Sequence, residues 1–134
     1  MGLATGVRGY ALVGDLTFLH DHNGLAIGPH ESRPDLTIVV LNDDGGGIFA
    51  LLEQGAVEHG DSFERIFGTP VGADLASLCA GYRVPYQRAT TAAELRFALT
   101  PGPGIRVVEV RADRSRLRDL HARLRAAVTD SALR

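Results

Sequence analysis

The chain has 134 residues, of which 45 % are hydrophobic and 22 % are charged, a length and composition typical of one domain with its own apolar core. A single cysteine and no lysine exclude a disulfide framework, a multi-cysteine metal site, a Walker-type phosphate loop and a Schiff-base enzyme. The net charge of −2 argues against a nucleic-acid partner. No apolar run reaches the roughly 18 residues of a membrane span, so we expect a cytoplasmic protein.

The first half of the chain alternates between strand and helix patterns. From the amino end we expect a strand over 8–13, a helix over 17–27, a strand over 36–41 and a helix over 48–54. Residues 36–41 (LTIVVL) are apolar except for Thr37 and show no polar alternation, which is typical of a parallel strand covered on both faces. Residues 55–70 contain three glycines and mixed charges, and we expect them to be irregular and mobile.

The second half continues this alternation. We expect a helix over 74–80, a strand over 84–88, a helix over 91–99, a strand over 105–110 and a helix over 113–128. Asp74 is the expected N-cap of its helix, and Thr91 and Glu94 have the spacing of a capping box. The last helix carries an apolar stripe, expected to lie in the core, that consists of Leu117, Leu120, Leu124 and Val128. The alternation predicts an α/β fold with a mostly parallel sheet flanked by helices.

Two acidic turns follow two of the predicted strands. One is Gly14-Asp15, and the other is Asn-Asp-Asp-Gly at residues 42–45. Ligands of open α/β sheets bind at such strand ends, and carboxylate, amide and backbone oxygens are the ligands that Mg²⁺ shares with phosphate groups. These residues by themselves indicate a Mg²⁺–phosphate site. The alternative is that turns after strands are commonly acidic and rich in glycine whatever their function.

Three sequence blocks carry a family resemblance. Gly14-Asp15, a stretch of 26 residues, then Asn42-Asp43 is similar to the thiamine-diphosphate signature, which usually has Gly-Asp-Gly followed by Asn-Asn. Leu16 and Asp43 depart from that pattern and indicate one branch. Residues 14–25, 36–55 and 63–70 resemble the C-terminal, diphosphate-binding domain of the 2-succinyl-5-enolpyruvyl-6-hydroxy-3-cyclohexene-1-carboxylate synthase family of menaquinone biosynthesis. The resemblance implies a thiamine-diphosphate-binding fold over nearly the whole chain.

The resemblance also implies cofactors, namely thiamine diphosphate and Mg²⁺, with Mn²⁺ as a substitute. It implies that the metal ligands are Asp15, Asp43 and the backbone carbonyl of Gly45. The other cofactor-binding residues that it implies are Gly14, Thr17, Phe18, Asn42, Ile48 and Phe49. Ile48 and Phe49, together with Leu52, would line the substrate pocket, and the alternative is that these three side chains are core.

The family implied here consists of homodimeric or homotetrameric transferases that decarboxylate 2-oxoglutarate on thiamine diphosphate and add the succinyl-semialdehyde unit to isochorismate. Its glutamate for the aminopyrimidine ring belongs to a pyrimidine domain, which this chain does not match, and the middle domain is not matched either. We therefore expect residues 1–134 to be a single, N-terminally incomplete domain that has no catalytic residue of its own and is inactive alone. Two alternatives stay open: a domain of another thiamine-diphosphate decarboxylase or carboligase, and a non-catalytic Mg²⁺–diphosphate-binding module.

Overall fold

The computed structural model describes residues 3 and 6–132, which form two compact units. Unit 1 comprises Met1–Asn42 and Gly72–Ala112, and unit 2 comprises Asp43–Val71 and Asp113–Arg134. Unit 1 contains the strands of the chain's parallel sheet, whereas unit 2 consists of helices and short helical turns.

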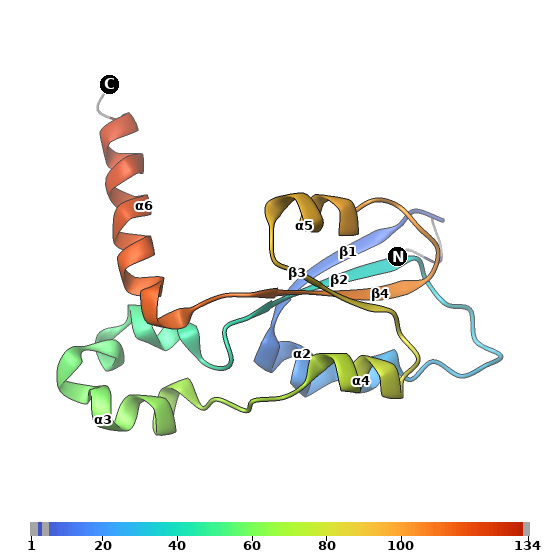
Figure 1. Cartoon of the computed structure of the whole chain (residues 1–134), viewed down its shortest axis with the longest axis horizontal. Helices are drawn as coiled ribbons and strands as arrows, with labels where there is room; N and C mark the ends of the chain where they lie inside the picture. Colours follow the sequence, from blue (N-terminus) through green and yellow to red (C-terminus); the bar gives the residue numbers. More distant parts are fainter. Residues whose placement is uncertain (1–2, 4–5, 133–134) are drawn as a thin grey trace. The chain divides into compact units, whose positions relative to one another are not determined.

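The sheet of unit 1 has four parallel strands in the order β1-β2-β4-β3 (Figure 1). Their bounds are Gly9–Gly14 for β1, Leu36–Asn42 for β2, Tyr86–Ala89 for β3 and Ile105–Arg111 for β4. All four strands, and the α/β class, are therefore confirmed. β3 begins two residues later than expected, because the amide of Val84 donates to the carbonyl of Cys79 at 2.9 Å instead of joining the sheet.

Helices cover both faces of this sheet, as the continuous apolar strands predict. In Figure 1, α2 (Asp15–Asp21) and α4 (Leu75–Gly81) lie on one face, and α5 (Ala92–Ala98) lies on the other. The larger core cluster lies under α2 and α4 and contains Phe18, Leu25, Val40, Leu75, Cys79, Val84, Ile105 and Val107. The smaller cluster lies under α5 and contains Ala89, Ala98 and Val108.

The helix starts of unit 1 follow their predicted caps, with one shift. Asp74 Oδ1 accepts from the amide of Ala76 at 3.1 Å, and Thr91 Oγ1 accepts from the amide of Glu94 at 3.1 Å. The carboxylate of Glu94 reaches back to the amide of Thr90 at 2.7 Å, one residue before the position that a capping box uses. The first helix begins at Asp15 rather than at residue 17, so Asp15 lies in its first turn.

In unit 2, the expected helix over 48–54 is wrong. Its place is taken by two 3-10 turns, Gly47–Leu51 and Glu53–Gly55. Leu52 between them has an extended backbone (φ −96°, ψ −177°), which interrupts the i to i−4 hydrogen bonds of an α-helix.

The expectation of an irregular segment over 55–70 is wrong for most of its length. A 3-10 turn over Val57–His59 leads into α3 (Gly60–Phe63) and a π-helical turn over Glu64–Gly68. Aromatic packing accompanies this order, because the Phe67 ring lies 5.7 Å from the Phe49 ring and 6.1 Å from the Phe63 ring, centroid to centroid. Such pairs add stability beyond the apolar area that they bury.

The last helix forms, but its apolar stripe does not belong to the core. A 3-10 turn over Arg114–Arg116 precedes α6 (Leu117–Ala132). Leu124 is 54 % exposed, and Leu120 and Val128 are exposed as well, so the core assignment of these three side chains is wrong. Arg118 near the start of α6 donates to the carbonyls of Ala50 and Leu52 in unit 2, whereas Leu120, Leu124 and Val128 lie further along the helix. Within the described residues no helix is long and apolar enough to cross a membrane.

Replacement of Leu75 by alanine should lower the free energy of unfolding by about 3 kcal/mol, because the fully buried side chain would leave a cavity. Leu124→Ala on the exposed stripe is the matched control, and it should change that free energy by less than about 0.5 kcal/mol. Urea unfolding followed by circular dichroism measures both values. Equal losses for the two variants would contradict the assignment of Leu75 to the core and of Leu124 to the surface.

Candidate functional site

The first group of predicted site residues lies in unit 1, where β1 becomes α2. Gly14 is the last residue of β1, and Asp15 is the first of α2. Asp15 is buried, and its Oδ1 accepts from the amide of Leu16 at 2.6 Å. Its carboxylate is therefore held at the carboxyl edge of the sheet, where α/β folds bind ligands.

Thr17 and Phe18 follow on the same helix with different environments. Thr17 is exposed, whereas Phe18 belongs to the larger core cluster. A contact between Phe18 and a diphosphate would therefore use the backbone of this residue, because its ring packs in the core. The four predicted residues 14, 15, 17 and 18 thus lie together, as the sequence motif requires.

Asn42, the last residue of β2, is buried and belongs to a polar network around Glu109 of β4. Glu109 is 1 % exposed, and its Oε1 accepts from Asn42 Nδ2 at 2.5 Å and from Arg111 Nε at 3.0 Å. Its Oε2 accepts from Arg88 Nε at 2.9 Å and from the Tyr86 hydroxyl. Asn42 also accepts the amide of Ala112 at 2.9 Å through its backbone carbonyl. The end of β2 is therefore held through both its side chain and its main chain.

The hydrogen bonds to Glu109 decide its ionisation. Burial by itself raises the pKa of this carboxyl, but the hydrogen bonds from Tyr86, Arg88, Asn42 and Arg111 outweigh burial and lower its pKa to about 2. Glu109 is therefore a carboxylate at neutral pH and cannot act there as a general acid. Sequence analysis missed this residue, although a charged side chain inside the apolar strand VVEVR signals a buried group that needs partners.

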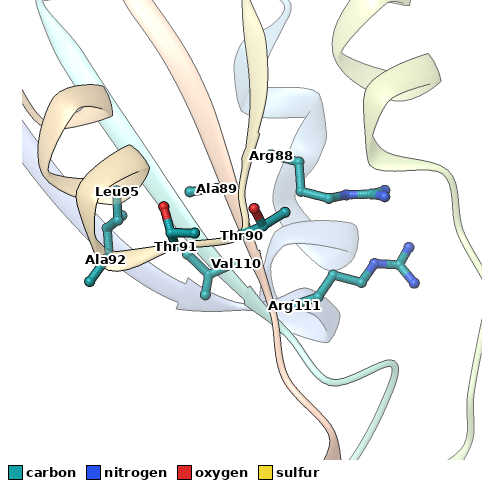
Figure 2. A pocket seen from close by; sticks show the side chains of 8 residues that line it. All are labelled: Arg88, Ala89, Thr90, Thr91, Ala92, Leu95, Val110 and Arg111. Atoms are coloured by element: carbon teal, nitrogen blue, oxygen red, sulfur yellow. The ribbon is translucent and has the colours of Figure 1, made fainter.

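A hollow of about 310 Å³ lies at the carboxyl ends of β3 and β4, lined by residues 88–92 with Leu95, Val110 and Arg111. Figure 2 shows Thr91 and Leu95 on one side, while the guanidinium groups of Arg88 and Arg111 extend together in the opposite direction. The hollow includes none of the predicted site residues. Its two arginines are those that share Glu109.

The second group of predicted residues lies in unit 2, in the turn over residues 43–47. Asp44 has φ 57° and Gly45 has φ 136°. Residues with a side chain rarely adopt the second value. A Cβ atom on Gly45 would lie 1.9 Å from the carbonyl oxygen of Gly68. A Cβ atom on Gly47 would lie 1.8 Å from Oδ2 of Asp43. These two glycines therefore let the turn approach its neighbours and let the Asp43 carboxylate lie against the backbone.

Arg114 and Val71 hold this turn from within unit 2. Arg114 Nη1 donates to the carbonyl of Asp43 at 3.1 Å and to the carbonyl of Asp44, and Nη2 forms an ion pair with Glu64. The amide of Val71 donates to Oδ1 of Asp44 at 3.2 Å. Sequence analysis missed Arg114, because nothing in the local sequence shows that residues 43 and 114 are neighbours.

The three predicted pocket residues are exposed. Ile48, Phe49 and Leu52 are all accessible on the turns that follow residue 47. The alternative that they are core side chains of this chain is therefore wrong. Whether they line a substrate pocket stays a prediction.

The donor chemistry of the predicted ligands fits a hard cation. Asp15 and Asp43 offer carboxylates and Gly45 offers a carbonyl, and Mg²⁺ prefers such oxygen ligands. Across the described part of the chain, no three side chains of His, Cys, Asp or Glu come together as a metal site.

The parallel α/β sheet, with acidic residues at its carboxyl edge, is consistent with a thiamine-diphosphate-binding domain. No protein-family model matches the chain. The chain is 64 % identical over 126 residues to the 2-succinyl-5-enolpyruvyl-6-hydroxy-3-cyclohexene-1-carboxylate synthase of Saccharopolyspora erythraea. It is 62 % identical over 122 residues to the synthase of Rhodococcus erythropolis and 55 % identical over 127 residues to that of a Nocardioides species.

These alignments cover 94 %, 90 % and 94 % of this chain, but 23 %, 23 % and 24 % of the respective synthases. The chain is therefore homologous to one segment of these synthases, and it spans about a quarter of their length.

Glu109 should make stability depend on pH at the acid end. Because its folded pKa is lowered from 4.5 to about 2, its contribution of about 3 kcal/mol is present above pH 4.5 and is lost as the pH falls toward 2. Denaturant unfolding between pH 2 and 7 measures this loss. In Glu109→Gln the same interval should show a correspondingly smaller decline, and an unchanged decline would contradict the assigned pKa.

Proposed function

We propose that this chain is the thiamine-diphosphate- and Mg²⁺-binding part of a 2-succinyl-5-enolpyruvyl-6-hydroxy-3-cyclohexene-1-carboxylate synthase of menaquinone biosynthesis. The observation that carries the proposal is the 64 % identity over 94 % of the chain. The acidic residues at the carboxyl edge of the sheet and the glycine turn support it, because they are suited to a metal-bound diphosphate.

In this proposal Asp15, Asp43 and the carbonyl of Gly45 hold Mg²⁺. Gly14, Thr17 and Phe18 contact the diphosphate where β1 becomes α2. Asn42, which Glu109 holds at 2.5 Å, keeps the end of β2 in place beside the cofactor. Mn²⁺ can replace Mg²⁺, since the ligand set consists of oxygen atoms.

Bound thiamine diphosphate supplies the carbanion chemistry that decarboxylates 2-oxoglutarate and extends isochorismate. The residues of this chain bind and orient the cofactor through the metal, and Ile48, Phe49 and Leu52 line the substrate side. The glutamate that engages the aminopyrimidine ring comes from a domain outside this sequence, in a homodimer or homotetramer. The chain is thus a single domain of a larger transferase.

The second candidate is a non-catalytic module that binds Mg²⁺ and a diphosphate. The donor set supports it, since oxygen ligands suited to Mg²⁺ and a diphosphate are not by themselves catalytic groups. A domain of another thiamine-diphosphate decarboxylase would be a third case, against which the identity to three synthases argues. Addition of a complementary pyrimidine-domain polypeptide distinguishes the synthase part from the non-catalytic module, because only the synthase part would then turn over 2-oxoglutarate and isochorismate.

The metal assignment predicts unequal effects of two isosteric changes. Asp15→Asn should weaken Mg²⁺-dependent thiamine-diphosphate binding at least tenfold, because it removes a negatively charged ligand. Asp44→Asn is the matched control and should change affinity less than threefold, since it keeps an acceptor for Val71 and tolerates φ 57°. Titration calorimetry with thiamine diphosphate and Mg²⁺ measures both. Asp43→Asn should be mild, because the thiamine-diphosphate signature usually has asparagine at this position and the site is therefore suited to an amide ligand. Equal losses at positions 15 and 44 would refute the ligand set.

The chain by itself should have no synthase activity. In the proposed function, the glutamate that engages the cofactor lies outside this sequence. Proton transfer by such a positioned group contributes a factor of about 10² to 10⁴ to the rate, and orientation of the reactants contributes more. The purified chain with thiamine diphosphate, Mg²⁺, 2-oxoglutarate and isochorismate should therefore release no CO₂ above the protein-free background. Turnover at ordinary enzymatic rates would mean that a glutamate of residues 1–134 acts on the cofactor, and the proposed domain role would be wrong.

A further inference from the structure

Arg114 is the one residue in the described part of unit 2 whose guanidinium is recorded on two successive carbonyls of the glycine turn. Nη1 donates to the carbonyl of Asp43 at 3.1 Å and to that of Asp44, while Nη2 pairs with the carboxylate of Glu64. The Arg114 side chain is only 15 % exposed. It lies so close to Gly45 that a Cβ atom there would be 2.9 Å from Nη1. The guanidinium therefore fills the space behind the turn.

The turn uses an uncommon backbone conformation. Asp44 has φ 57°, in the left-handed region that non-glycine residues seldom adopt, with aspartate and asparagine the most frequent exceptions. Residues in such conformations persist where the surrounding structure holds them. Two hydrogen bonds from one planar guanidinium fix the orientation of two successive peptide groups, and thus the direction in which the chain enters Gly45.

We propose that Arg114 is a positioning residue for the metal ligands Asp43 and Gly45. Its guanidinium donates hydrogen bonds to the carbonyls of Asp43 and Asp44 and so fixes the orientation of the peptide groups on either side of Asp44. The Asp43 carboxylate and the Gly45 carbonyl are the two ligands that this turn contributes in the proposed function. The inference rests on the proposed function, because it takes Mg²⁺ as the ion that the turn binds.

The charge of Arg114 and its positioning role predict opposite effects on cation affinity when the residue is replaced. Loss of a positive charge near two aspartates would by itself strengthen cation binding, since the guanidinium repels the metal ion. Loss of positioning weakens cation binding, and changes in groups that orient metal ligands typically reduce metal affinity about 10- to 100-fold. Arg114→Lys keeps the charge but lacks the planar fork that holds two carbonyls and Glu64 together.

Arg118 offers a matched control in the same unit. It also holds two backbone carbonyls, those of Ala50 at 3.0 Å and Leu52 at 2.7 Å, but these lie beyond the glycine turn. Arg118→Gln therefore removes the same charge and the same kind of hydrogen bond without touching the metal ligands.

The test is a titration of the full chain with Mn²⁺ in the presence of thiamine diphosphate, followed by electron paramagnetic resonance. Arg114→Gln and Arg114→Lys should each weaken Mn²⁺ binding about tenfold or more, and Arg118→Gln should change it less than twofold. Hydrogen exchange of the ligand-free chain supplies an independent readout. The amide of Gly46, which donates to Gly68 at 2.8 Å, should exchange at least tenfold faster in both Arg114 variants and at an unchanged rate in Arg118→Gln.

Three results would overturn the inference. One is tighter Mn²⁺ binding by Arg114→Gln, which would mean that charge alone matters. Another is equal weakening by Arg114→Gln and Arg118→Gln, which would mean that general loss of stability is the cause. The third is exchange at Gly46 that is as slow in both Arg114 variants as in the wild-type chain, where the wild-type chain does bind Mn²⁺. A wild-type chain that binds no Mn²⁺ with thiamine diphosphate would instead contradict the proposed function itself.

Discussion

The carboxylate of Glu109 is the constraint on which the carboxyl edge of the sheet depends. It is buried and charged, and such a group is tolerated only when it is paired and hydrogen-bonded. Its partners come from three adjacent strands: Asn42 from β2, Tyr86 and Arg88 from β3, and Arg111 from β4 itself. Loss of one partner leaves a buried charge unbalanced, which typically costs about 3–5 kcal/mol. The network therefore holds the carboxyl ends of these strands together. One of its members, Asn42, directly precedes the acidic turn in the chain.

The turn of unit 2 is constrained by its backbone instead. Its glycines are required by close approach, because a Cβ atom on Gly45 or Gly46 would lie about 2 Å from a carbonyl oxygen of the segment over residues 67–68. Asp44 is held in a left-handed conformation by bonds from Arg114 and Val71. The end of the sheet is thus fixed by a buried charge, whereas the turn of unit 2 is fixed by close glycine packing.

Both constraints use arginine, which is the only basic residue type besides histidine in this chain. Arg88 and Arg111 share one carboxylate, whereas Arg114 and Arg118 each hold pairs of backbone carbonyls. A planar guanidinium can serve two acceptors in fixed directions, and lysine cannot. Two arginines near the start of the last helical segment, Arg114 and Arg118, therefore organise the backbone of unit 2.

The sequence by itself determined the α/β class, all four strands and the caps at Asp74 and Thr91, because these depend on apolar runs and on contacts within a few residues. It also brought Gly14, Asp15 and the turn at 42–45 to attention. The helical turns over 60–68 and the exposure of Leu124 followed from packing between residues far apart in the chain. Glu109 and Arg114 escaped notice for the same reason, since apart from Arg111 their named partners lie 21 to 71 residues away. A residue's local sequence records its own propensity, whereas its role as a partner exists only once the tertiary structure has placed the other group beside it.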